Sequence, residues 1–277
     1  MNTAGFVVGG RREPGPEGMQ IETWLDRPEL RLRMGEDGRA RAAGTWIRSV
    51  VLHTTKGLPG SNDEPPQQIL PGLGDPVDAG QRVARYWSRD GRQAGAHLIV
   101  DFDGRVSQTA DLRDEMTWHC PGHNTSSIGV EIYQGSNAEL YEGQLDVVVR
   151  LCDWITKKFR IQRQIPFRYL DGPVPRFLVT KDSPNPASDV VGVIGHRDAA
   201  KNRGPGDPGS AVFYRLGRAG YEPFDFSVYE DRETWRRRQR DLGIADPDGI
   251  PGPATCEALV ANGFETGLWV RRPGDDA

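Results

Sequence analysis

Residues 190–213 read VVGVIGHRDAAKNRGPGDPGSAVF, and this stretch decides how the fold is interpreted. It opens with the β-branched run VVGVI, which predicts a buried strand. The strand ends at Gly195 and His196, so an imidazole lies where a strand meets a loop, a common position for functional residues. The loop that follows, rich in glycine and proline, returns a carboxylate at Asp207. These two side chains can share a metal ion, but a catalytic zinc usually takes three protein ligands, so we expect a third elsewhere.

A second strand is predicted over residues 47–55, IRSVVLHTT, because apolar and β-branched residues dominate it. This strand ends with His53, in the same position as His196. Taken alone, such a histidine is typical of a buried structural residue. If the two strands are neighbours in one sheet, however, both imidazoles lie at the same end of it.

A third strand, residues 128–133, carries Glu131 between Val130 and Ile132. Glutamate is a poor strand former and is costly to bury without a partner. Two explanations fit: a salt bridge, or a general base that acts on a water near a metal and has a pKa raised by burial.

The other histidines favour structural roles. His97 lies within a predicted strand over residues 94–100, and we expect it to pack against a neighbour. His119, Cys120 and His123 resemble part of a second zinc site. A structural zinc site needs four ligands, and no matching pair follows elsewhere, so we expect no second site.

Composition limits the class of protein. The 277 residues can form one large core, or one domain plus a small one, and no apolar run is long enough for a membrane span. A net charge of −4 gives no reason to expect nucleic acid as a partner. The three cysteines do not indicate a disulfide framework, and residues 1–18 lack the apolar core of a signal peptide. We therefore expect the protein to be made in the cytoplasm. We also expect it to be a monomer.

The remaining pattern predicts an α/β (α+β) fold, with a mixed central β-sheet flanked by helices. The clearest helix covers residues 140–159, with Cys152 on its apolar side. Shorter helices are expected around residues 83–87 and 213–219. Residues 1–18 are expected to form a flexible lead, and residues 19–34 a strand or hairpin.

Four motifs then carry a resemblance: VVLHTT, AGAHLIVDFDGRV, TWHCPGHNTSSIGVEI and GHRDAAKNRGPGDPG, in that order over residues 46–220. Together they resemble the N-acetylmuramoyl-L-alanine amidase family related to T7-phage lysozyme and the peptidoglycan recognition proteins. The resemblance implies a zinc ion in a surface groove, with His53, His196 and Asp207 as its ligands.

The resemblance also points to one branch of the family. Where other branches have a catalytic tyrosine, this chain has Ala96, which is similar to the anhydro-muropeptide amidase branch that relies on the strand glutamate, here Glu131. The family often has lysine two residues before the third ligand, and that place is Pro205 here. Lys201 or Arg203 would then supply the positive charge.

The C-terminal part resembles the small three-helix peptidoglycan-binding repeat, in residues 224–264. We expect helices from about residue 229 and from residue 255. The first is basic, which indicates either a solvated face or a surface that docks on an anionic wall polymer. The expected domains are an N-terminal extension (1–45), a zinc amidase domain (46–221), a peptidoglycan-binding-like helical module (222–267) and a tail (268–277).

The implied reaction is hydrolysis of the amide between N-acetylmuramic acid and L-alanine. Zinc polarises the carbonyl, Glu131 moves the proton, and Lys201 or Arg203 holds the oxyanion. His119 and Asn124 fall where the family lines its groove, and the substrate is a wall polymer or a soluble muropeptide. Alternatives are a non-catalytic wall-recognition protein and a structural-zinc protein. The enzyme would reach the wall by phage lysis or secretion, or act in the cytoplasm on recycled fragments.

Overall fold

The computed structural model describes residues 5–32, 39–55, 68–89, 94–136, 138–166, 191–199, 207–224, 232–247 and 258. Lys201, Arg203 and nearly all of the expected second C-terminal helix lie outside these residues.

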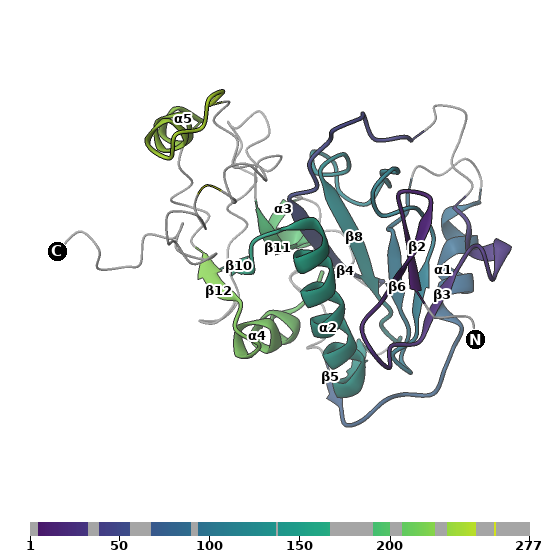
Figure 1. Cartoon of the computed structure of the whole chain (residues 1–277). Coiled ribbons are helices and arrows are strands. Elements are labelled where there is room, and N and C mark those ends of the chain that lie inside the picture. Colours follow the sequence, from purple (N-terminus) through teal and green to yellow (C-terminus); the bar gives the residue numbers. More distant parts are fainter. Residues whose placement is uncertain are drawn as a thin grey trace.

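A six-stranded mixed sheet forms the centre of the molecule (Figure 1), as the sequence predicted. Its strand order is β11-β4-β8-β6-β7-β3. All neighbouring pairs are parallel except β6 and β7, which form a hairpin. The strand bounds are β11 Gly192–Gly195, β4 Ser49–Thr54, β8 Ser127–Ile132, β6 Leu98–Val100, β7 Val106–Gln108 and β3 Ile21–Thr23.

One face of the sheet holds the main apolar core. Alternate strand residues such as Val50, Leu52 and Val130 are fully buried there. Helix α2 (Glu142–Phe159) packs on this face and contributes residues with helical spacing, including Leu145 and Cys152. Helix α4 (Ser210–Arg218) lies beside α2. Helix α2 was predicted from its periodicity, and the short helix expected around residues 213–219 is α4, which begins at Ser210.

The opposite face of the sheet is covered in part by helix α1 (Ala79–Trp87). A smaller apolar cluster forms there between this helix and Ile99 of β6. Because side chains alternate along a strand, the residues between the core positions of β4 and β8 point to this second face.

The N-terminal residues form ordered structure, so the expectation of a flexible lead was wrong for the described residues from Gly5 onward. Strands β1 (Gly5–Val8) and β2 (Arg11–Pro14) form an antiparallel hairpin. Phe6 is fully buried with its ring 4.6 Å from that of Trp154 in α2. The side chain of Gln108 bonds both backbone groups of Val7. The expected strand in residues 19–34 is β3, and it joins the central sheet beside β7.

The remaining elements are short. Strand β5 (Gln68–Leu70) pairs with β9 (Glu139–Tyr141), and β10 (Gln164–Pro166) pairs with β12 (Glu222–Phe224). Single turns are formed by η1 (Pro28–Leu30) and α3 (His196–Ala199), and the C-terminal helix α5 covers Arg232–Asp241. Among the described residues, no helix combines the length and apolar character needed to cross a bilayer.

Candidate metal centre

Three side chains converge at one end of the sheet: His53 from β4, His196 from α3, and Asp207 from the turn before α4. The Nδ1 atoms of the two histidines are 2.8 Å apart, and His196 Nδ1 lies 3.2 Å from Asp207 Oδ2. All three side chains are almost completely buried. The structure therefore brings together the three residues that the sequence predicted as ligands.

The chain around the three residues fixes their positions. Strand β11 is parallel to β4 and pairs with it directly, which places His196 just beyond the strand end near His53. His196 begins the short helix α3 rather than a loop, which differs from the expectation. The backbone N–H of Thr54 donates to Asp207 Oδ1 at 3.0 Å, and the N–H of Arg197 donates to the backbone carbonyl of Asp207 at 2.8 Å. Asp207 is therefore held by the same two segments that carry the histidines, through its carboxylate by Thr54 and through its backbone carbonyl by Arg197.

Glu131 lies beside His53, because the two residues are direct partners in the parallel pairing of β4 and β8. Partners in register point to the same face of a sheet, so the carboxylate and the imidazole share one face. Val130 and Ile132, on either side, are fully buried in the core, whereas Glu131 is half-buried. The glutamate is thus out of the apolar core and on the face of the metal ligands.

His119 and Asn124, predicted to contact substrate, lie within the protein next to this centre. They are 7% and 8% exposed. His119 Nε2 is 2.8 Å from Ser127 Oγ, and Asn124 Oδ1 accepts hydrogen bonds from the backbone N–H groups of His119 and Cys120. The Asn124 side chain therefore shapes the loop that carries His119.

His97 is fully buried and hydrogen-bonded, as predicted. Its Nδ1 accepts the backbone N–H of Gly129 at 3.0 Å, and its Nε2 lies 3.0 Å from the carbonyl oxygen of Glu115. Burial, with the positive charge of Arg41 nearby, holds the pKa of His97 well below its usual value. The imidazole is consequently neutral at physiological pH.

The sequence did not identify Arg41 as part of this region. Arg41 is 8% exposed, and its guanidinium donates to the backbone carbonyls of Asn124 and Ser127. It also lies 2.9 Å from His97 Nε2. Burial lowers the pKa of Arg41 to about 10. An arginine in a segment without periodicity gives no signal that it will be buried.

His123 has a different environment. It is fully buried, and within the described part of the chain neither ring nitrogen has a hydrogen-bond partner. Burial, with His196 and Arg48 nearby, lowers the pKa of His123 to about 3. Together with Cys120 and His119, it falls outside the metal-binding group found among the described residues.

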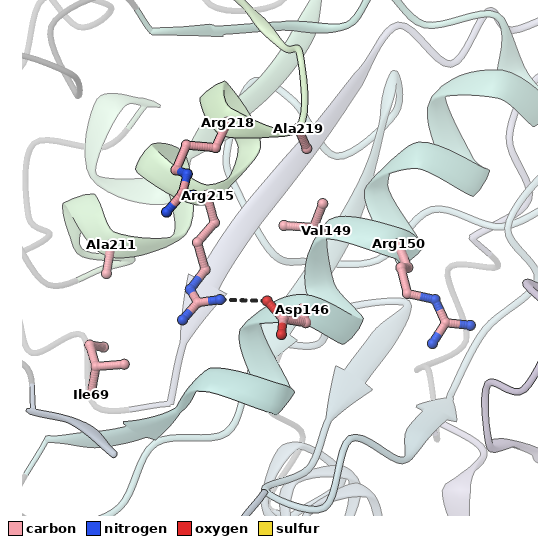
Figure 2. Close-up of a pocket in the computed structure, with 8 residues that line it drawn as sticks. All are labelled: Ile69, Asp146, Val149, Arg150, Ala211, Arg215, Arg218 and Ala219. Atoms are coloured by element: carbon pink, nitrogen blue, oxygen red, sulfur yellow. Dashed lines mark hydrogen bonds and ion pairs between the residues drawn. The ribbon is translucent and has the colours of Figure 1, made fainter. Parts of the chain in front are cut away.

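A cavity of about 600 Å³ lies beside α2 and α4, on the side of the sheet away from the candidate metal centre (Figure 2). Arg215 reaches across it to Asp146 of α2. None of the three candidate ligands lines it. The residues that do are Ile69, Asp146, Val149, Arg150, Ala211, Arg215, Arg218 and Ala219.

Residues 43–210 match the family model described as N-acetylmuramoyl-L-alanine amidase. The match covers more than half of the chain and contains His53, Glu131, His196 and Asp207. The chain belongs to the N-acetylmuramoyl-L-alanine amidase family. This confirms the resemblance that the four sequence motifs carried, and the family indicates action on the amide bonds of peptidoglycan.

Several solved structures are similar to part of this chain. Drosophila peptidoglycan recognition protein SD is 13% identical, with a TM-score of 0.43 over 73% of this chain and 96% of that chain. Drosophila PGRP-LB is 14% identical, with a TM-score of 0.42 over 77% and 99%. An endolysin of a Thermus scotoductus bacteriophage is 17% identical, with a TM-score of 0.39 over 73% and 100%. The comparison with curated proteins gives no significant match.

The residues of this amidase-family chain fit a zinc ion. Imidazole nitrogens and a carboxylate oxygen are typical zinc ligands, and three protein ligands leave a coordination position open for catalysis. The candidate ligand atoms of His53, His196 and Asp207 all lie within 4.8 Å of one another. The donor set therefore fits a three-ligand zinc site with an open position, in contrast to the closed four-ligand set of a structural site.

Proposed function

We propose that this protein is a zinc-dependent amidase that hydrolyses the bond between N-acetylmuramic acid and L-alanine in peptidoglycan. The observation that carries the proposal is the convergence of His53, His196 and Asp207 with Glu131 on the same face of the sheet. A binding protein without catalysis needs neither a complete ligand set nor a carboxylate next to it. Zinc, when bound, supplies Lewis-acid polarisation of the amide carbonyl.

Glu131 acts as the general acid and base. Its carboxylate accepts a proton from the attacking water and then delivers it to the nitrogen of the leaving alanine. The half-buried position next to His53 suits this role, because the group reaches substrate while the buried strand holds its backbone. The same residue on the core face of β8 would be enclosed by apolar side chains.

Further roles are proposed for residues near the centre. Lys201 or Arg203, in the segment of the sequence between α3 and Asp207, stabilises the developing oxyanion. His119 and Asn124 contact the substrate with the small fraction of their surface that is exposed. Substitution of each residue, with KM and kcat measured separately, separates binding from catalytic roles.

The test of the function is Glu131→Gln. The variant should bind zinc as the wild type does and lose about a hundredfold or more in rate, since general acid–base help contributes about 10²–10⁴-fold. Release of the stem peptide from purified sacculi measures the rate, with and without a chelator. Glu139→Gln changes a half-buried glutamate of strand β9 that is not among the candidate ligands; it is the matched control and should remain fully active.

Two outcomes would contradict the proposal. If Glu131→Gln hydrolyses sacculi at the wild-type rate, Glu131 is a structural residue. If the wild-type protein holds no zinc and cleaves nothing but still sediments with sacculi, the protein is a non-catalytic wall-recognition protein.

We also propose that the substrate is the polymeric wall. A wall-binding module raises the local concentration of an insoluble polymer, whereas it brings no gain for a soluble muropeptide. Because β12 pairs with β10, the C-terminal segment should be removed after Phe224 to keep that pair intact. Truncation should lower sacculus lysis several-fold and leave hydrolysis of a soluble muramyl peptide unchanged. Equal lysis by both proteins would exclude a wall-directed role for the segment.

A further inference from the structure

The ring of His119 lies between strand β8 and the candidate ligand His53. A Cβ atom added to Gly129 would be 2.6 Å from His119 Cγ, so the ring packs directly on the glycine backbone. The edge-to-face contact with His53 has a centroid separation of 5.5 Å and an interplanar angle of 87°. The orientation of the His119 ring therefore limits the orientations open to the His53 ring.

Two hydroxyl groups hold the His119 ring from opposite sides. Its Nε2 is 2.8 Å from Ser127 Oγ, and its Nδ1 is 2.9 Å from Thr117 Oγ1. The Ser127 hydroxyl donates in turn to the backbone carbonyl of His123 at 2.7 Å. Because the Ser127 hydroxyl gives its one proton to the His123 carbonyl, it accepts from His119 Nε2–H, and His119 Nδ1 then accepts from the Thr117 hydroxyl.

The Thr117 hydroxyl also reaches the next buried histidine. It lies 3.1 Å from His97 Nδ1, the same nitrogen that accepts the backbone N–H of Gly129. Thr117 and His97 are both fully buried. The hydroxyl thus lies between the His119 ring and a histidine that is anchored on the backbone of β8, the strand that carries Glu131.

We propose that Thr117 is a positioning residue for the metal ligand His53 and acts through His119. Its hydroxyl sets the plane of the His119 ring, which packs against His53 and limits the rotation of that imidazole. The proposal rests on the metal site of the proposed function. It adds a residue that touches neither the metal ligands' donor atoms nor the reacting groups.

The experiment compares zinc affinity in Thr117→Val and Thr117→Ser by competition with a chromophoric chelator. Valine keeps the shape but removes the hydroxyl, and we expect about tenfold weaker zinc binding, the size typical for loss of an outer-shell partner. Serine keeps the hydroxyl and should restore affinity to within about twofold of the wild type. Thr117→Ala provides a second variant without the hydroxyl in case valine prevents folding.

Thr156→Val is the matched control. Thr156 is 1% exposed, and its hydroxyl donates to the backbone carbonyl of Cys152 on the core side of the molecule. Its loss should lower thermal stability without changing zinc affinity. Wild-type affinity in both Thr117→Val and Thr117→Ala would overturn the positioning role while leaving the proposed function intact. A wild-type protein that binds no zinc would instead overturn the proposed function, and this inference with it.

Discussion

The two faces of the central sheet are made by alternate residues of the same strands, and they carry opposite chemistry. In β4, Leu52 points into the apolar core and its neighbour His53 points to the candidate metal centre. In β8, Val130 points into the same core, and its neighbour Glu131 lies on the face of the candidate metal centre. A shift of one residue in either strand would turn the polar residues toward the apolar core and the apolar residues toward the metal centre, so the core itself fixes the register that builds the site.

This arrangement separates function from stability. The core face holds α2 and the main apolar cluster, whereas the other face holds the ligands, Glu131 and the buried histidines. Substitutions on the metal face should therefore change chemistry with little effect on folding. Substitutions on the core face should do the reverse.

The largest expected effect is that of His53→Ala. The variant should lose zinc and hydrolytic activity together, because two remaining ligands are too few for a catalytic zinc. Its thermal unfolding should stay close to that of the zinc-free wild type, since the substituted side chain is outside the apolar core. Metal analysis and unfolding of the two proteins measure both effects. Full zinc content in the variant would show that the ligand assignment is wrong.

Leu145→Ala tests the opposite face. Leu145 is fully buried in α2, and truncation of a buried leucine costs about 2–5 kcal/mol of unfolding free energy. Urea unfolding measures the loss. Zinc affinity and activity per folded molecule should remain within about twofold of the wild type, because distant sites without shared partners are nearly independent. A large fall in zinc affinity would mean that the two faces are coupled.

Much of the sheet and of the metal centre was predictable, because the signals are local. Apolar runs gave strands β4, β8 and β11, and helical periodicity gave α2. His53, His196 and Asp207 stand in sequence motifs that the family match contains, and the structure brings them together. The glutamate between two apolar strand residues was a signal in itself, since such a residue needs a physical reason to be there.

The missed features depend on contacts between distant segments. The hairpin of β1 and β2 is held by Gln108 and Trp154, more than a hundred residues away, and no local pattern encodes these contacts. Arg41 and Thr117 owe their positions to backbone groups and histidines of other segments. The domain boundaries remain a prediction.

His123→Leu gives an effect of intermediate size, which appears only in acid. With a pKa near 3 in the folded protein and about 6.5 when unfolded, His123 takes up its proton preferentially in the unfolded state below pH 6.5. The unfolding free energy therefore falls with decreasing pH, by about 1.4 kcal/mol per unit for this residue. Above pH 7, His123 is neutral in both the folded and the unfolded protein, so it no longer makes the unfolding free energy depend on pH.

Leucine removes this titration, so the variant should lose less stability than the wild type between pH 6.5 and 5. At pH 7.5 it should be about as stable as the wild type, because both ring nitrogens of His123 lack hydrogen-bond partners in the described structure. Urea titrations of the zinc-free proteins at several pH values provide the comparison. Parallel pH profiles would show that His123 binds a proton equally in both states.

The smallest expected effect is that of Arg215→Gln. This variant tests whether the contact between α4 and α2, on the core face, influences zinc binding at the metal centre. Arg215 forms one ion pair with Asp146 of α2 (Figure 2) and another with Glu142 of the same helix, and both carboxylates are more than half exposed. Exposed pairs contribute about 0–1 kcal/mol and are screened by salt, so the loss of stability should be about 1 kcal/mol or less and should shrink at 1 M salt. Arg218→Gln is the matched control, since Arg218 lies on the same helix and forms no ion pair with the described residues.

Helix α4 begins three residues after Asp207, so a looser contact between α4 and α2 would be one way to displace that ligand. Asp207 is held instead by the backbone N–H of Thr54 and by Arg197, on the side of the sheet edge. We therefore expect unchanged zinc affinity in Arg215→Gln, and a measurable loss would show that the position of Asp207 depends on the contact between the two helices.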